Sequence, residues 1–366
     1  MRINDIISHL ESIAPPAYQE TYDNAGLITG AADWECKGIL TCLDATEEVI
    51  GEATRKGCNL VVAHHPIVFT GLKKITGRNY VERAVIKAIK NDIAIYAIHT
   101  NLDNVLQGVN DRMADKLDLV NRRILLPKEN NLLKLYTFAP LDAADQVREA
   151  VFKAGGGRIG NYYNCSYNIR GEGRFTPGKG SDPTIGEIGK EEVTEEVKIE
   201  IIFPAYRKRS VIDAMIKAHP YEEVAYDIVP LSNYFQDVGS GLIGELETPQ
   251  EETFFLEKLK NQFNLRLVKH TPLLNKPVKR VALCGGAGSF LVSHALAAGA
   301  DAFITADMKY HEFFDADGRM LIADIGHYES EQFTIDLLYD ILQEKFPTFA
   351  VLKTEVSTNP VRYYPG

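Results

Sequence analysis

Short apolar runs that end in polar clusters are the feature that most limits how this chain can fold. The runs are rich in β-branched residues, are too short for core helices and show little alternation, which is typical of strands buried on both faces of a sheet. The runs, each with the polar cluster that follows it, are 38–43 with 44–46, 59–63 with 64–66, 93–98 with 99–103, 280–284 with 285–289, 301–305 with 307–312, and 320–324 with 325–327.

Helical patterns lie between these runs, at 47–56, 80–91, 291–298 and 331–344. Alternation of strands and helices predicts a layered α/β domain with a mostly parallel sheet. In such sheets, ligands bind beyond the carboxyl ends of the strands. The polar clusters follow the runs rather than precede them, so we expect a functional site at this edge of one sheet.

The middle of the chain has a different pattern. Strands are expected at 132–138, 197–203 and 224–229, helices at 143–154 and 209–218, and a loop rich in Gly, Pro and Ser at 170–189. These elements fit the β-α-β-β-α-β order of a ferredoxin-like α+β module, with one of its four strands left unassigned. We therefore expect residues 129–235 to form an inserted domain that splits an α/β domain made of residues 1–128 and 236–366.

Composition narrows the class of protein. Of the 366 residues, 45% are hydrophobic and 25% charged, as expected for a globular chain with a core. The net charge of -10 argues against binding to nucleic acid or to a membrane surface. The chain shows no signal-peptide pattern and no membrane-spanning stretch. Its five scattered cysteines fit reduced thiols, so we expect a cytoplasmic protein.

Histidines gather at the ends of the expected strands, where five of the nine lie: His64, His65, His99, His311 and His327. Adjacent residues in a strand point to opposite faces, so His64 and His65 can share a site only if the chain has left the strand. Pro66 favours such a break. In the alternative interpretation, one imidazole packs in the core and the other is exposed.

Two carboxylates could complete a metal site. Asp103 follows a strand and is the candidate for bridging two cations. His327 and Glu331 are four residues apart and would share one face of a helix. Glu329 fits better as a carboxylate near the helix N-terminus.

These residues together form a ligand set of three imidazoles and two carboxylates: His64, His65, Asp103, His327 and Glu331. Such a set suits two divalent metal ions roughly 3.5–4 Å apart, which can lower the pKa of a bound water to about 7 and promote hydrolysis. Imidazole and carboxylate ligands admit zinc, iron, manganese, nickel or cobalt. We expect two divalent ions per subunit, foremost zinc, iron or manganese, and the sequence does not identify which.

A fourth polar cluster contains Asp307, His311 and Glu312. These residues could orient the ligand imidazoles or contact a substrate. His99 and Glu312 are candidate catalytic residues that would shuttle protons. The glycine-rich stretch 285–289 fits a tight turn better than an anion-binding loop, because it lacks the full dinucleotide or Walker pattern.

Six stretches of the chain form one combined set of motifs: 22–30, 43–46, 63–67, 99–103, 284–289 and 326–331. Together these motifs resemble the NIF-three-like family, whose members are commonly named GTP cyclohydrolase 1 type 2 homologues. Mild departures are Tyr22, where Trp is common, and Ala45, where Val is common. In the middle of the chain, the stretches 161–166, 186–189 and 218–223 resemble the CutA/PII-like insertion of the longer bacterial members.

The resemblance implies a dinuclear site built from the same five ligands, in a ring-shaped homohexamer whose openings the insertion would cap. It implies a metal-dependent hydrolase acting on a nucleotide or another small molecule, in its sharpest form a GTP cyclohydrolase. A metal-dependent phosphoesterase or amide hydrolase is an alternative. A non-catalytic metal-binding regulatory or scaffold protein is another, so whether the chain is an enzyme stays open at this point.

Overall fold

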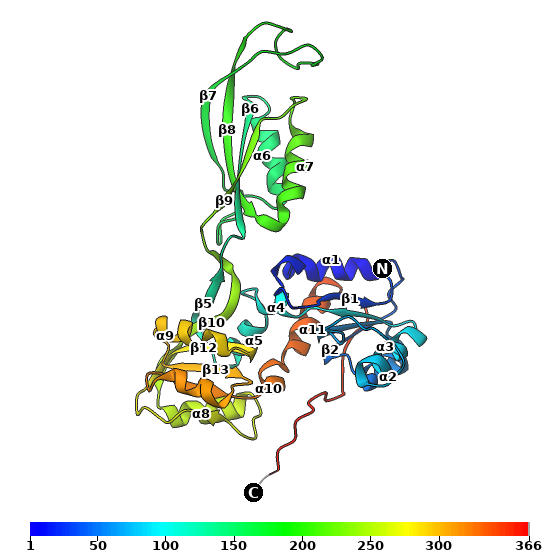
Figure 1. Ribbon diagram of the computed structural model, residues 1–366, viewed down its shortest axis with the longest axis vertical. Helices are drawn as coiled ribbons and strands as arrows, with labels where there is room; N and C mark the ends of the chain where they lie inside the picture. The colour runs from blue at the N-terminus through cyan, green and yellow to red at the C-terminus, as the bar shows by residue number, and fades with distance from the viewer. Residues whose placement is uncertain (365–366) are drawn as a thin grey trace. The chain divides into compact units, whose positions relative to one another are not determined.

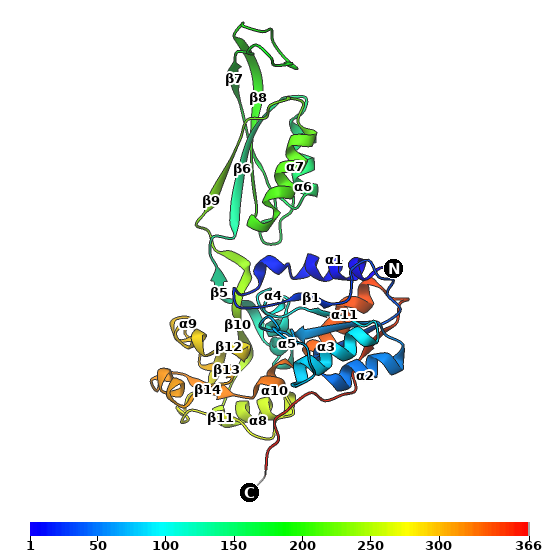
Figure 2. The same cartoon turned by 45° about the vertical axis from the view of Figure 1, so that its right-hand side comes forward.

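The computed structural model describes residues 1–364, which form two compact units. Unit 1 contains residues 1–126 and 237–366, and unit 2 contains residues 127–236. These boundaries lie within two residues of those expected from the sequence. Figures 1 and 2 show both units as ribbons.

The parallel strands of unit 1 divide between two sheets, where the sequence had suggested one. The first sheet has the order β1-β4-β3-β2-β15 and the second the order β11-β14-β13-β12-β10-β5. Antiparallel strands adjoin each parallel core, β1 in the first sheet and β10 and β11 in the second. The strands are β1 (Gly26–Thr29), β2 (Ile39–Asp44), β3 (Leu60–His65), β4 (Ala94–Ala97), β5 (Val120–Lys128), β10 (Phe235–Gln250), β11 (Lys269–His270), β12 (Val278–Ala287), β13 (Ala302–Ala306), β14 (Leu321–Asp324) and β15 (Val351–Lys353).

Helices cover both faces of the two sheets, which is why the strands read as continuous apolar runs. In the first sheet, α2 and α3 lie side by side on one face (Figures 1 and 2), and α11 packs against β2 and β3. In the second sheet, α8 and α9 belong to separate core clusters. The helices are α1 (Ile3–Ile13), α2 (Glu47–Lys56), α3 (Tyr80–Lys90), α4 (Thr100–Asp103), α5 (Val109–Lys116), α8 (Glu252–Gln262), α9 (Val292–Ala297), η4 (Tyr310–Ala316), α10 (His327–Glu331) and α11 (Thr334–Lys345), with short η1 (Pro16–Tyr18) and η3 (Ser289–Leu291).

Helix α2 has a capping residue at each end that can be recognised in the sequence. The Thr46 side chain accepts a hydrogen bond from the amide of Val49 and caps the first turn. Gly57 ends the helix in the left-handed region with φ +73°, which costs glycine little. The sequence pattern predicted this helix over the same residues, 47–56.

Unit 2 has the expected β-α-β-β-α-β order. Its four-stranded antiparallel sheet has the order β7-β8-β6-β9, and α6 and α7 lie on the same side of that sheet (Figure 1). Residues 170–175, expected in a loop, belong to the exposed strand β7, because pairing with β8 decides their conformation rather than their own composition. The elements are β6 (Leu132–Pro140), α6 (Ala144–Lys153), β7 (Tyr167–Phe175), β8 (Glu192–Pro204), η2 (Ala205–Arg207), α7 (Lys208–Ala218) and β9 (Tyr226–Leu231).

Candidate metal centre

The end of β3 supplies the first two histidines of the site. The strand includes both residues and ends directly before Pro66, so the chain has not left the strand at the histidine pair as expected, yet the ring centroids of His64 and His65 lie only 4.9 Å apart. Both rings reach one site because it lies beyond the last residue of the strand, where side chains from both faces of the sheet converge.

His64 is completely buried and its tautomer follows from its contacts. Its Nδ1 lies 2.9 Å from the Ile98 carbonyl oxygen, which can only accept, so Nδ1 carries the hydrogen. Nε2 is then a lone-pair donor without a hydrogen-bond partner, 3.5 Å from the Asp103 Oδ1 atom. Asp103 Oδ1 is also buried and unpartnered.

His65 lies between two carboxylates. Its Nδ1 donates to Asp44 Oδ1 at 2.8 Å, and its Nε2 donates to Glu331 Oε2 at 2.9 Å. A ligand imidazole typically donates one nitrogen to a carboxylate, which leaves the other for the metal. Asp44 therefore fixes the ring so that Nε2 points toward Glu331.

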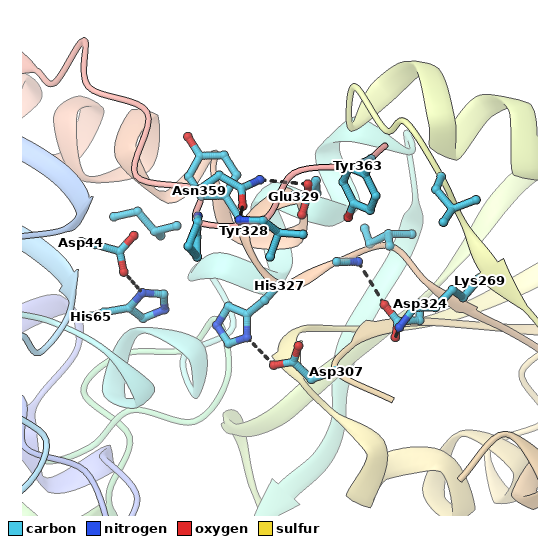
Figure 3. Close-up of a pocket in the computed structure, with 16 residues that line it drawn as sticks. Asp44, His65, Lys269, Asp307, Asp324, His327, Tyr328, Glu329, Asn359 and Tyr363 are labelled. Carbon is cyan, nitrogen blue, oxygen red and sulfur yellow. Dashed lines mark hydrogen bonds and ion pairs between the residues drawn. The ribbon is translucent and has the colours of Figure 1, made fainter. Parts of the chain in front are cut away.

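Helix α10 holds His327 and Glu331 on one face, as their spacing predicted. His327 Nε2 lies 3.0 Å from Glu331 Oε2, and the side chain of Glu331 is buried. The other ring nitrogen, Nδ1, donates to Asp307 Oδ2 at 2.6 Å, a contact drawn in Figure 3. Asp307 thus has the orienting role that the sequence suggested for it.

His99 lies beside the two β3 histidines, with ring centroids 5.2 Å from His64 and 5.3 Å from His65. Its Nδ1 donates to Asp23 Oδ1 at 2.8 Å. Burial opposes ionisation of Asp23, but hydrogen bonds from His99 and Thr100 outweigh it and lower the pKa of Asp23 to about 2. His99 is therefore held by an ionised carboxylate at the rim of the cluster.

Two groups of side chains could each hold a metal ion. One contains His64, His65 and His99, the other contains His65, His327 and Glu331, and within each group the ligand atoms lie within 4.8 Å of one another. The groups share His65, and Asp103 contacts His64. The structure thus brings together all five candidate ligands.

Glu312 does not join this cluster. Its carboxylate accepts a hydrogen bond from the backbone amide of Lys309 at 2.8 Å, at the start of η4. The ring of His311 packs against Tyr310, with centroids 5.2 Å apart. Among the described residues, no hydrogen bond or ion pair connects either side chain to the candidate ligands, so the structure gives the catalytic role suggested for Glu312 no support.

Burial and ion pairing shift the pKa values of the histidines in this cluster in opposite directions. Burial lowers the pKa of His64 to about 3. Burial also opposes protonation of His65 and His327, but hydrogen bonds to Glu331 and to Asp44 or Asp307 raise their pKa values to about 10 and about 9. A metal would have to displace the protons of these two rings, as ligand binding requires.

The two central carboxylates differ in their affinity for a proton. Burial and the neighbouring charge of Glu331 hold the pKa of Asp103 well above its usual range. Burial would also raise the pKa of Glu331, but hydrogen bonds from His327 and His65 hold it well below the usual range. A cation between them would stabilise both carboxylates in the ionised form.

The glycine-rich stretch includes the last residues of β12, where the pairing with β13 shifts register between Leu283 and Ala287. Gly286 has φ +62°, and its amide donates to the Ser330 hydroxyl at 3.0 Å. A Cβ atom at this position would collide with Glu331 Oε1. The stretch expected to form a tight turn is therefore an irregular end of a strand, and its left-handed backbone beside Glu331 favours glycine.

A cavity of about 560 Å³ opens beside the cluster within unit 1 (Figure 3). His65, His327, Asp44 and Asp307 line it, together with residues 359–361 and Tyr363. The volume lies in the range of small-molecule pockets, roughly 300–1,000 Å³. A small molecule in this cavity would touch the rings of two candidate ligands.

The sequence interpretation missed three residues that support the site. Asp44 holds His65, Asp23 holds His99, and Thr358 donates to Asp44 Oδ2 at 2.6 Å. Asp44 could have been found, because it follows a strand just as the ligands do. Asp23 and Thr358 lie in segments without periodicity, and only the folded chain brings them to the site.

Fold and site together define a class: an α/β protein with a histidine and carboxylate cluster, suited to metal binding, at the carboxyl ends of its strands. Among residues 1–364, no helix is long and apolar enough to cross a membrane. The family model Duf34/NIF3 (NGG1p interacting factor 3) matches residues 1–360, and the chain belongs to this family.

Similar proteins agree with this assignment. The chain is 40% identical over 364 residues to a "GTP cyclohydrolase 1 type 2 homolog" of Halalkalibacterium halodurans, which covers 98% of each chain. It is 37% identical to the protein with the same name in Bacillus subtilis, over 98% of this chain and 97% of that one. The crystal structure of a Bacillus cereus protein related to NIF3 superposes with a TM-score of 0.87 at 37% identity, covering 100% of this chain and 99% of the other.

Proposed function

We propose that this chain is a metal-dependent hydrolase that binds two divalent metal ions and acts on a nucleotide. The metals would be held by His64, His65, Asp103, His327 and Glu331. Bound divalent ions supply Lewis acidity and lower the pKa of a water molecule. The names of the similar bacterial proteins, which refer to a GTP cyclohydrolase, support the nucleotide as the substrate class.

One observation carries the metal-binding part of this proposal. His64 Nε2 and Asp103 Oδ1 are buried, lie 3.5 Å apart and have no hydrogen-bond partner. A buried polar atom without a partner costs about 1–3 kcal/mol, so two adjacent ones call for a ligand. A water molecule could bridge them, but the surrounding imidazoles and carboxylates are metal ligands by type.

The residues around the metals would then position the substrate and move protons. His99, held by the ionised Asp23 carboxylate, lies beside His64 and His65, where its ring can accept or donate a proton. The cavity lined by His65 and His327 would admit the substrate. Hydrolysis would take place where the cavity meets the cluster.

Metal content per chain, measured by elemental analysis of protein purified without chelator, tests the proposal. Wild type is expected to carry about two divalent ions per chain, and the His65→Ala, Asp103→Asn double variant to lose them. His311→Ala, which changes a histidine outside the cluster, is the matched control and should keep both ions. Wild-type protein that takes up no metal on soaking would refute the proposal.

The proposal includes a homohexamer in the cytoplasm. The family resemblance supports the hexamer, and the free state of all five cysteines supports a reducing compartment. Light scattering should give six times the chain mass of 40.8 kDa. A monomeric mass at micromolar concentration would exclude the ring.

A further inference from the structure

The last described part of the chain, residues 354–364, forms no helix or strand and is called the tail segment here. It follows β15, which pairs in parallel with β2, so that Val351 lies opposite Ile39 and Lys353 opposite Thr41. Parallel strands run in the same direction. The tail segment therefore continues toward the carboxyl end of β2, where Asp44 lies.

Hydrogen bonds attach the tail segment to the rest of unit 1 at two places. Near its start, the buried carboxylate of Glu52 accepts from the Thr354 hydroxyl and, at 3.0 Å, from the Glu355 amide. Further along, Asn359 Nδ2 donates to Glu329 Oε1 at 3.0 Å (Figure 3). These contacts fix the segment against unit 1 as one wall of the cavity beside the cluster.

Between these two attachments, Thr358 contacts the cluster through Asp44. The Thr358 hydroxyl donates to Asp44 Oδ2 at 2.6 Å, and the other oxygen, Oδ1, accepts from His65 Nδ1 at 2.8 Å. Among the described residues, these are the side-chain hydrogen bonds of the Asp44 carboxylate. With one partner on each oxygen, the carboxylate has one preferred rotation, and this rotation sets the plane of the His65 ring.

We propose that Thr358 is a positioning residue of the metal centre, acting through Asp44 on His65. This inference rests on the proposed function, since it assumes that His65 Nε2 ligates a metal. Without the Thr358 hydroxyl, Asp44 Oδ2 loses its donor and the carboxylate can rotate away from His65. The His65 ring then has no fixed orientation in the metal-free protein. Because the ring must become ordered when the metal binds, the metal affinity falls. Groups that hydrogen-bond to ligands typically contribute 10–100-fold to metal affinity.

The test is zinc affinity of the full-length protein, measured by competition with a chromophoric chelator. Thr358→Val keeps the shape of the side chain but removes the hydroxyl, and should weaken binding of the His65-ligated zinc about tenfold. Thr358→Ser keeps the hydroxyl and should restore wild-type affinity. Thr354→Val is the matched control, because it removes a hydroxyl of the same segment that contacts Glu52 instead of Asp44.

A double-variant cycle separates this role from general docking of the tail segment. If Thr358 acts through Asp44, then Thr358→Val should cause no further loss of affinity in an Asp44→Asn background. An equal loss in Thr354→Val and Thr358→Val, or an additive loss in the double variant, would overturn the inference.

Failure of the proposed function would look different. Wild-type protein that binds neither zinc, iron nor manganese refutes the metal centre itself, whatever the tail segment does. The inference can still be decided on that metal-free protein by NMR of ¹⁵N-labelled histidine. A shift of the His65 ring signals in Thr358→Val, absent in Thr354→Val, would support it, and unchanged His65 signals would overturn it.

Discussion

Each of the three histidines in the proposed ligand set is held by a partner outside that set. The Ile98 carbonyl holds His64, Asp44 holds His65, and Asp307 holds His327. A backbone carbonyl cannot be removed by mutation, but the two carboxylates can. Substitutions of these two carboxylates therefore separate the contribution of ring orientation to metal affinity from the contribution of ligation.

Asp307→Asn should weaken metal binding without removing a ligand. The amide can still hydrogen-bond to His327 Nδ1, but it lacks the charge that favours a basic ring, so the affinity should fall about 10–100-fold. Competition with a chelator measures the change. Asp315→Asn, an exposed position on the η4 helix that follows Asp307 in the chain, serves as the control and should bind metal like wild type. Equal affinity for Asp307→Asn and wild type would contradict the role of Asp307.

At the scale of elements, the end of β12 limits where Glu331 of α10 can lie. Gly286→Ala would place a Cβ atom 2.4 Å from Glu331 Oε1 and would also strain a backbone at φ +62°. Loss of both metals and a lower melting temperature are expected, by elemental analysis and thermal unfolding.

The matched control for this substitution is Gly57→Ala. Its backbone has φ +73°, but nothing lies within 4 Å of the added Cβ, so it measures backbone strain alone. It should cost about 1 kcal/mol of stability and leave the metal content unchanged. Full metal content in Gly286→Ala would show that Glu331 moves aside without loss of the site.

The sequence predicted those elements whose ends are marked locally. Helix α2 was predicted over its observed residues, because Thr46 and Gly57 carry capping information in their own chemistry. Strand β7 was missed, because its exposed residues and glycines become a strand only by pairing with β8. The division into two sheets was missed for the same reason: strand pairing joins residues that no local pattern relates.

The residues of the candidate site, like the elements, could be predicted only where the sequence carries a local signal. The five proposed ligands could be chosen because His and carboxylate residues follow apolar runs, and the structure brings all five together. The catalytic role suggested for Glu312 stays a prediction, since its carboxylate accepts a hydrogen bond from the Lys309 amide at the start of η4. Thr358 carries no signal in the sequence, since its role depends on the path of the tail segment along β2.

At the scale of the whole molecule, unit 2 is an insertion between two neighbouring strands. The chain leaves unit 1 in β5 and returns in β10, and these strands are neighbours in the second sheet. Each unit has its own core, with the cluster around Leu135 and Ile201 confined to unit 2. Unit 1 should therefore fold without the insertion.

Replacement of residues 129–235 by a short glycine-containing loop tests this independence. The shortened chain should unfold cooperatively and retain the metal content of wild type, because all five ligands lie in unit 1. Circular dichroism during heating and elemental analysis are the measurements. A soluble but metal-free product with a broad transition would mean that the insertion contributes to the order of unit 1.

The contact between His65 and Glu331 spans 266 positions of the chain. During synthesis, the β3 histidines leave the ribosome long before α10 exists, so the nascent chain carries an incomplete set of ligands for most of its translation. The missing members, His327 and Glu331, both come from one short helix made near the end. Under the proposed function, stable metal capture would therefore be confined to nearly finished chains, and the metal would bind after translation rather than during it.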